Sequence, residues 1–404
     1  MEISFSMIQT IGLAIIVLLI GRFLRSKIKL FQDFAIPSPV IGGVLFSILN
    51  LILRQTGTVL FEFDTILQDF FMIIFFTSIG FNASIATLKA GGPMVIKFLI
   101  VASVLCVFQN IVALGLSGIV DVEPGLALMT GSTPMTGGHG TAAAISTLVE
   151  DAGIIGAETV AVTAATFGLV AGSLMGGPVA NRLINSRDLV SKKQANKEVL
   201  NIDESLLATV ERPLSGERIN MAFFVILIAM GVGTYISDFL NSLVGNITEL
   251  ASFPAYIGPM ILAIIARYIS DKGSDFVPAE EVEIVGSVGL NIFLAMALMT
   301  LKLWELAALA IPLLVLLLAQ TILVFLYTNF VTFPVMGKDY DAAVLAAGHC
   351  GFSMGATPNG VANMESVVDK FIDSKMAFFV LPIVGGMFID FANVMIIIVF
   401  LTFI

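Results

Sequence analysis

Long apolar segments divide the chain into two halves that follow the same order. In the first half they cover residues 5–21, 35–53, 66–87, 94–119 and 157–181, and in the second half 219–239, 253–270, 284–301, 306–330 and 376–403. A helix needs roughly 20 apolar residues to cross the hydrocarbon core of a bilayer. We therefore expect five transmembrane helices in each half of the chain.

One polar, glycine-rich stretch interrupts each half between its fourth and fifth apolar segments. The first stretch runs from Gly131 to Thr141 and the second from Gly348 to Gly360. So many Gly, Ser, Thr and Pro residues do not fit one unbroken helix. Non-helical backbone at membrane depth is tolerated only where protein covers it or where it lines a polar cavity, and a matched pair of interruptions is typical of a transporter's binding site.

An odd number of spans per half places the two halves in opposite orientations across the membrane. Positively charged residues test this arrangement, because they concentrate in the inside loops of membrane proteins. If the N-terminus lies outside, 18 of the 20 Lys and Arg residues fall on the inside, and only Arg54 and Lys302 fall outside. Both termini are therefore expected outside, with the connection between the halves in the cytoplasm.

A glycine-rich stretch that crossed the membrane would reverse every later helix and spoil this charge distribution. We therefore expect two re-entrant hairpins, at about 125–150 and 341–368, whose tips approach each other near the middle of the membrane. The predicted fold class is an all-α polytopic membrane protein with two inverted repeats of five transmembrane helices, each with a re-entrant hairpin. The repeats cover residues 1–184 and 218–404, and a cytoplasmic linker covers 185–217.

An offset of 217 residues relates the two halves. It superimposes Pro37 on Pro254 and Gly138 on Gly355, but the few identities that it produces are no better than chance. The repeat hypothesis therefore depends on the shared order of the spans and on the shared position of the glycine-rich interruptions.

The composition agrees with a membrane protein and excludes a soluble domain. Of the 404 residues, 57% are hydrophobic and only 12% are charged, and the formal charge of −10 gives no reason to expect a nucleic-acid partner. Cys106 lies in an apolar segment and Cys350 in the second polar stretch, so we expect no disulfide between them. His349 precedes Cys350, but neighbouring residues on a helix do not face each other, and no zinc-type spacing occurs. The sequence therefore favours neither an enzyme nor a cofactor.

A hairpin that folds back at a glycine-rich turn exposes backbone amides at the start of one helix and carbonyls at the end of another. Amides attract carboxylates, and carbonyls coordinate cations. In the second stretch, Thr357 and Pro358 suit the positions at which a helix begins. The candidate substrate-binding residues are Thr136, Gly137, Gly138, His139, Gly140, Thr141, Ser353, Gly355, Thr357 and Asn359.

Hydroxyl, amide and carboxylate oxygens are the ligands that a small cation needs. The candidate cation ligands are Asn82, Ser132, Thr133, Asn291, Asn363 and Asp390. A carboxylate inside an apolar span is costly, so Asp390 favours cation or proton coupling over a structural hydrogen bond. Each hydroxyl or amide could equally cap a helix or bond to the preceding turn. The sequence places no Lys or Arg deep in a predicted span, so an anionic substrate would depend on helix N-termini and bound cations.

Several motifs resemble those of the sodium/glutamate symporter family along nearly the whole chain. They are Ile36-Pro37 with Gly42-Gly43, Gly137 to Thr141, Leu294 to Glu305, Asp341 to Gly351, Gly355 to Pro358, and Ala362 to Met364. The resemblance implies uptake of glutamate driven by sodium ions, with sodium as the coupling ion and no other cofactor. It also implies a bacterial inner membrane, both termini in the periplasm, and a homodimer in which a hairpin-bearing domain moves against a scaffold.

Two other functions stay open. The first is a sodium- or proton-coupled carrier for another small carboxylate, since the family often has Thr-Ala where this chain has Asn359-Gly360. The second is a passive channel, which would conduct without saturation and without ion coupling.

Overall fold

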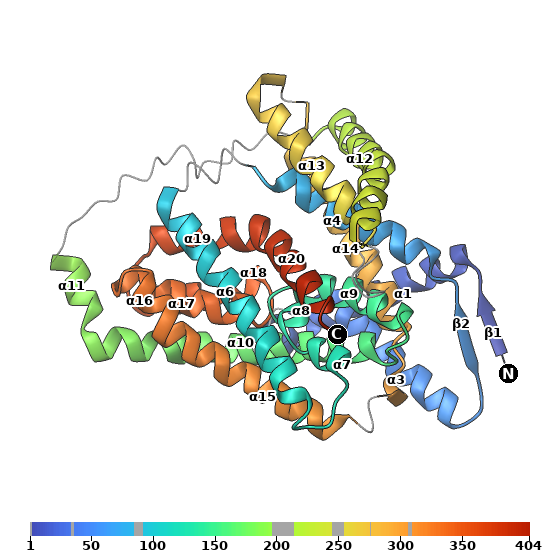
Figure 1. The fold of residues 1–404 in the computed structure, drawn as a ribbon, viewed down its shortest axis with the longest axis horizontal. Helices are drawn as coiled ribbons and strands as arrows, with labels where there is room; N and C mark the ends of the chain where they lie inside the picture. The colour runs from blue at the N-terminus through green and yellow to red at the C-terminus, as the bar shows by residue number, and fades with distance from the viewer. Residues whose placement is uncertain are drawn as a thin grey trace.

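The computed structural model is almost entirely helical over the residues that it describes, which are 2–33, 36–84, 92–195, 214–244, 254–274, 276–305 and 309–404 (Figure 1). The main helices are α1 (Met7–Lys27), α3 (Ser38–Gln55), α4 (Ile66–Asn82), α6 (Gly92–Ser117), α10 (Ala157–Arg187), α12 (Gly216–Val244), α13 (Ile257–Ile269), α14 (Ala279–Met299), α15 (Ala310–Tyr327), α19 (Lys375–Ile383) and α20 (Ile389–Leu401).

Seven of the described helices are long and apolar enough to cross a membrane, namely α1, α3, α6, α10, α12, α14 and α15 with its helical continuation to Val335. An eighth span results if α19 and α20, which bend by 47° relative to each other, are taken together. Helices α4 and α13 have 17 and 13 residues, or about 26 and 20 Å of helix. The chain is therefore a multi-pass helical membrane protein with seven or eight full-length spans among its described residues, rather than the ten that we expected.

The two shorter helices fall where the predicted spans were 66–87 and 253–270. Helix α13 gives way after Ile269 to a π-helical turn, in which Gly273 has a φ of 140° that only glycine adopts readily. Helix α4 ends at Asn82, and residues 85–87 and 253 of the predicted spans lie outside the described part of the chain.

Two short strands pair near the N-terminus, and the all-α prediction was wrong in this detail. Strand β1 (Glu2–Phe5) runs parallel to β2 (Leu60–Phe63), and the rings of Phe5 and Phe63 stack at 5.4 Å. Both segments alternate in burial, as a strand with one covered face does. Helix α1 consequently begins at Met7 and not at residue 5, with a capping box between Ser6 and Gln9.

The helix breaks in the two glycine-rich stretches are confirmed. The first stretch contains α8 (Ser132–Met135) and the start of α9 (Gly138–Asp151), and α7 (Pro124–Leu128) precedes it. The second stretch contains the end of α17 (Tyr340–Phe352) and the start of α18 (Thr357–Val368). At the first break Gly138 has a φ of 62°, and at the second Pro358 occupies the first turn of α18. Both breaks therefore follow from residues that the sequence shows directly.

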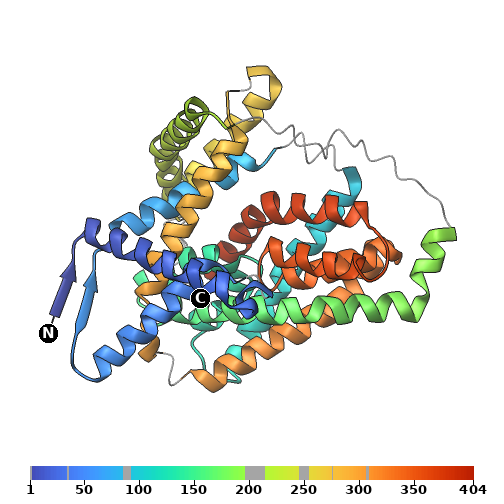
Figure 2. The same cartoon turned by 180° about the vertical axis from the view of Figure 1, so that it is seen from behind.

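The helices form two groups, which Figures 1 and 2 show from opposite sides. The six-helix group consists of α1, α3, α4, α12, α13 and α14, in which α4 and α14 pack against each other. The hairpin group consists of α6 to α10 and α15 to α20 and has one continuous apolar core. A separate apolar cluster, which includes Phe76 of α4, Phe293 of α14 and Val394 of α20, joins the two groups.

The predicted linker at 185–217 is helical at both ends. Helix α10 continues to Arg187, α11 (Leu189–Ala195) follows directly, and α12 begins at Gly216. Asp188 joins α10 to α11 in a left-handed conformation with a φ of 49°. Residues 196–213 of the predicted linker lie outside the described part of the chain.

Candidate functional site

Both glycine-rich breaks face one cavity of about 370 Å³ between the six-helix group and the hairpin group. We call it the central cavity. The six-helix group contributes residues of α4 and α14, among them Phe75, Asn82 and Glu283. The hairpin group contributes both breaks and the segment from Gly385 to Asp390. The cavity therefore lies where the two groups meet, and every element that lines it comes from one of them.

The two tips touch in the central cavity. A Cβ atom added at Gly138 would lie 2.8 Å from the carbonyl oxygen of Gly355, which is closer than a side chain tolerates. The positive φ of Gly138 independently favours glycine at this position. The sequence prediction that the tips approach each other is thus confirmed, and the contact joins the two glycines that the 217-residue offset pairs.

Most of the predicted substrate-binding residues line the central cavity. These are Thr136, Gly137, Gly138, His139, Gly140, Thr141, Gly355, Thr357 and Asn359. Ser353 does not line it; its hydroxyl donates to the carbonyl of His349 at 2.6 Å and its own carbonyl accepts from Gln109 at 2.8 Å. Ser353 therefore ends α17 and ties it to α6.

Hydrogen bonds hold several cavity side chains in place. The Thr136 hydroxyl donates to Oε1 of Gln109 at 2.8 Å, and Nε2 of His139 lies 3.0 Å from the hydroxyl of Thr166. The Asn359 amide donates to the carbonyl of Leu169 at 3.2 Å and to the hydroxyl of Ser173 at 2.9 Å. These bonds connect both breaks to α6 and α10, so the tips are positioned by the helices behind them.

The predicted cation ligands separate into four sets. Asn82 and Asp390 line the central cavity, whereas Asn291 lines a second cavity. Asn363 donates to the carbonyls of Gly172 at 2.9 Å and Ala347 at 3.2 Å, which is a helix-packing contact. Ser132 and Thr133 are buried behind the first break. Of these residues, only Ser132 and Thr133 show the buried, unpaired oxygens described next.

Three of the buried side-chain oxygens without a hydrogen-bond partner among the described residues lie on two residues that touch and on the neighbour of one of them. They are the hydroxyls of Ser132 and Thr133 and Oδ1 of Asn393. Asn393 also donates through Nδ2 to the carbonyl of Ser132 at 3.0 Å, so the two residues are in contact. Asp390 lies one turn before Asn393 on the same helix and lines the central cavity. Buried polar atoms without partners require an explanation, and a bound cation would supply one.

Sequence reasoning missed part of the cavity wall. Helix α14 presents Glu283, Ser287, Leu290 and Leu294, and α4 presents Ser78. Spacings of four, three and four residues place the α14 side chains on one face of the helix. That spacing was visible in the sequence, but which face of an apolar helix meets a cavity depends on tertiary packing.

His349 and Cys350 do not form a reactive pair. His349 Nδ1 lies 2.9 Å from the hydroxyl of Thr332, and its ring packs against Phe98 and Phe352. Cys350 instead contacts the hydroxyl of Thr328 at 3.5 Å. Cys106 and Cys350 are both free, as predicted.

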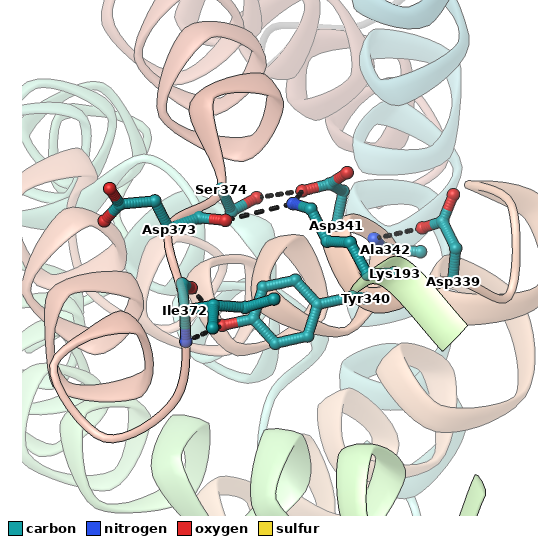
Figure 3. A network of polar contacts seen from close by, with 8 residues as sticks. All are labelled: Lys193, Asp339, Tyr340, Asp341, Ala342, Ile372, Asp373 and Ser374. Carbon is teal, nitrogen blue, oxygen red and sulfur yellow. Dashed lines mark hydrogen bonds and ion pairs between the residues drawn. The ribbon is translucent and has the colours of Figure 1, made fainter. Parts of the chain in front are cut away.

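A polar network joins α11 and the start of α17 to the segment between α18 and α19 (Figure 3). Lys193 of α11 donates to Oδ1 of Asp341 at 2.6 Å and to the carbonyl of Asp373 at 3.0 Å. The Ser374 hydroxyl donates to the same Asp341 oxygen at 2.6 Å, and the Tyr340 hydroxyl bonds to the backbone of Ile372. The network joins the start of α17, the end of the α18 segment and the helix that follows α10.

Asp339 caps α17 beside this network. Its carboxylate accepts a hydrogen bond from the amide of Ala342 at 2.8 Å. Burial raises the pKa of the Asp339 carboxyl above its usual value, and the bond from Ala342 opposes that rise.

The fold and the central cavity define a class of protein. A multi-pass helical membrane protein whose broken helices meet at a polar cavity has the architecture of a secondary transporter. The family model described as Sodium/glutamate symporter matches residues 3–373, and the chain belongs to this family. The motif resemblance is thereby confirmed, and the family is one of transporters and not of enzymes.

Individual relatives agree with the family. The chain is 41% identical over 396 residues to the "Sodium/glutamate symporter" of Escherichia coli (strain K12), with 96% of each chain covered. It is 39% identical over 396 residues to the protein of the same name from Haemophilus influenzae, with 97% of this chain and 96% of the other covered. A solved sodium proton antiporter from Methanocaldococcus jannaschii overlays with a TM-score of 0.40 at 16% identity, covering 98% of this chain and 95% of that chain.

Proposed function

We propose that this protein is a secondary active transporter that takes up glutamate together with sodium ions. The observation that carries the proposal is the central cavity, where both glycine-rich tips meet beside Asp390. Of the described residues that line the cavity, none is a Lys or Arg. An anionic substrate in this cavity therefore depends on backbone dipoles and on co-bound cations.

Helix N-termini supply the first of these. Residues Ala356 to Asn359, which begin α18, line the cavity, and so do Gly138 to Thr141 at the start of α9. The positive end of a helix dipole attracts a carboxylate by about 0.3–1 kcal/mol, and more when partly buried. Two such ends from opposite breaks suit a substrate with two carboxylates, as glutamate has.

Sodium ions supply the second. We propose that Asp390, with the unpaired oxygens of Ser132, Thr133 and Asn393, holds a coupling cation. Without a cation, Asp390 would repel an anionic substrate that enters the same cavity. Ordered binding of cation and substrate follows from this repulsion, and ordered binding is the basis of symport. Asn82, also in the cavity, is a further candidate ligand.

The inverted repeat is part of the proposal. With the 217-residue offset, α4 corresponds to α14, α8 to the end of α17, and α9 to α18. The surroundings of one glycine pair correspond as well: a Cβ atom added at Gly168 would meet the side chain of Met135, and one added at Gly385 would meet the ring of Phe352. These correspondences support repeats at 1–184 and 218–404, a cytoplasmic linker at 185–217, and re-entrant hairpins in both halves.

Alternating access would arise from movement of the hairpin group against the six-helix group. The cavity lies between the two groups, and Glu283 and Ser287 on its wall are exposed. Glu283 lies in the first turns of α14, the end that the positive-inside orientation assigns to the cytoplasm. We therefore propose an inward-open state of a protein of the bacterial inner membrane, with both termini in the periplasm. The family resemblance also leads us to propose a homodimer.

The test is uptake of radiolabelled glutamate by proteoliposomes with and without an inward sodium gradient. Saturable uptake that needs the sodium gradient supports the proposal. Uptake that follows a proton gradient, or stronger competition by another small carboxylate than by glutamate, would assign the alternative carrier function. Flux without saturation would assign a channel.

A further inference from the structure

A second cavity of about 500 Å³ adjoins the central one. It is lined by Arg22, Arg25, Ser26, Gln32, Pro37, Ser38 and Asn291. Pro37 lines both cavities, and on α14 Leu290 lines the central cavity while its neighbour Asn291 lines the second. The two cavities therefore meet at the start of α3.

This second cavity has the positive charge that the central cavity lacks. Arg22 and Arg25 lie three residues apart near the end of α1, and neither forms an ion pair with a carboxylate of the described residues. The N-terminus of α3, an 18-residue helix, opens on the same space at Ser38. Guanidinium groups bind carboxylates in bidentate pairs, so an anion of this class suits the lining.

Two of the polar side chains that line the second cavity have apolar counterparts at the corresponding positions of the other half of the chain. The 217-residue offset relates Arg22 to Phe239, and Asn291 to Ile74. Enrichment of positive residues on the inside would account for an Arg at the end of α1, but not for an amide in the middle of α14. Asn291 donates one N–H of its amide to the carbonyl of Ser287 at 2.7 Å, and the second N–H of the same amide is a donor that an anion can use. The combination therefore points to a ligand and not to topology alone.

We propose that the second cavity is an anion-binding vestibule that receives the substrate's carboxylates between the central cavity and the cytoplasm. The proposal rests on the proposed function, because it takes glutamate as the substrate and the end of α1 as cytoplasmic. Asp390 and Glu283 repel an anion that approaches the central cavity. Arg22 and Arg25 offset this repulsion at the cytoplasmic entrance, since a cleft lined by one sign of charge concentrates ions of the other.

The test compares the two faces of the membrane in the double variant Arg22→Gln/Arg25→Gln. Sodium-dependent glutamate uptake is measured in inverted membrane vesicles, which expose the cytoplasmic face, and in right-side-out vesicles, which expose the other. We expect the half-saturating glutamate concentration to rise about tenfold in inverted vesicles and to change less than about twofold in right-side-out vesicles. Added choline chloride should weaken the wild type in inverted vesicles and leave the double variant unchanged.

The matched control is Arg182→Gln/Lys192→Gln, which removes two positive charges from the same side of the membrane at residues that line neither cavity. It should behave as the wild type. If the wild type shows sodium-dependent uptake and the double variant at Arg22 and Arg25 has the same half-saturating glutamate concentration in inverted vesicles, the vestibule proposal is overturned and the proposed function is not. A wild type without sodium-dependent uptake in either kind of vesicle overturns the proposed function instead.

A phospholipid headgroup is the other source of an anion at this depth. Purified wild type and double variant are therefore compared in proteoliposomes of phosphatidylcholine alone and with added phosphatidylglycerol. A difference between the proteins that appears only with phosphatidylglycerol would show a lipid site and overturn the proposal. A difference that persists in phosphatidylcholine alone supports it.

Discussion

The contact between the two tips gives the sharpest test of the central cavity, through the substitution Gly138→Ala. Gly138 has a φ of 62°, and an added Cβ would lie 2.8 Å from the carbonyl oxygen of Gly355. A non-glycine residue held in the left-handed region costs about 1–2 kcal/mol, and relieving the clash moves the tips apart by a few tenths of an ångström. The combined cost is on the order of 1–3 kcal/mol.

We expect this cost to fall on ligand binding, because the tips carry the helix N-termini that we propose as the substrate site. A loss of 1–3 kcal/mol corresponds to roughly 5- to 150-fold weaker binding. The assay is sodium-dependent binding of radiolabelled glutamate to purified, monodisperse protein. The expected result is weaker binding with normal expression and an unchanged elution volume.

Gly153→Ala is the matched control for Gly138→Ala. Gly153 also has a positive φ, of 98°, but nothing lies within 4 Å of an added Cβ, and it does not line the central cavity. Its variant has backbone strain without displacement of the tips and should bind glutamate as the wild type does. If Gly138→Ala also binds within twofold of the wild type, close approach of the tips is not needed and our account of the cavity is wrong.

Three further predictions concern coupling, orientation and the polar network at the start of α17. Asp390→Asn removes the charge of the side chain and nearly keeps its shape, so the sodium concentration for half-maximal uptake should rise about tenfold, or uptake should be lost. Unchanged sodium dependence at normal expression would show that Asp390 has only a structural role. Single cysteines at Ser4 and Ile404 should react with an impermeant reagent from outside, and one at Lys192 only from inside; outside labelling at Lys192 would contradict the inverted repeat. Lys193→Met breaks the ion pair with Asp341, which is worth about 1 kcal/mol or less because the lysine side chain is 31% exposed. A cysteine at the buried Leu189 should therefore be labelled faster in Lys193→Met, while the melting temperature changes little. Equal labelling rates in Lys193→Met and Lys192→Met would exclude a role for the ion pair.

Features that depend on local chemistry were predictable from the sequence. The helix breaks follow from Gly138 and Pro358, and hydropathy alone predicts the seven or eight full-length spans of the described residues, although it also predicted full spans at the shorter helices α4 and α13. Asp390 was identified because a carboxylate in an apolar span is costly wherever it lies. Each of these conclusions needs only the residue and its neighbours along the chain.

Features that depend on packing were not predictable. Asn363 and Asp390 were both predicted as cation ligands, yet Asn363 bonds to the carbonyl of Gly172, and of the two only Asp390 lines the central cavity. Asn393 was overlooked because Ser132, to whose carbonyl it donates, is 261 residues away in the sequence. Glu283 was overlooked because it lies at the end of a span, where charged residues are ordinary.

In the inverted repeat that we propose, the two halves divide the chemistry between them. The 217-residue offset relates Asp390 to Ser173 and Asn393 to Gly176. Ser173 accepts a hydrogen bond from Asn359 at 2.9 Å, and Gly176 leaves room for the amide of Asn363, so the first half uses these positions to seat the second hairpin.

In the second half the same two positions have a carboxylate and an unpaired amide oxygen beside the first hairpin. A cation bound there would lie in one half of the proposed repeat only. Movement would depend on occupancy because Asp390 without a cation leaves an uncompensated charge in the cavity, whereas a cation and an anionic substrate together offset it. Coupling of the two ligands through this one site is therefore what would allow the sodium gradient to drive net uptake.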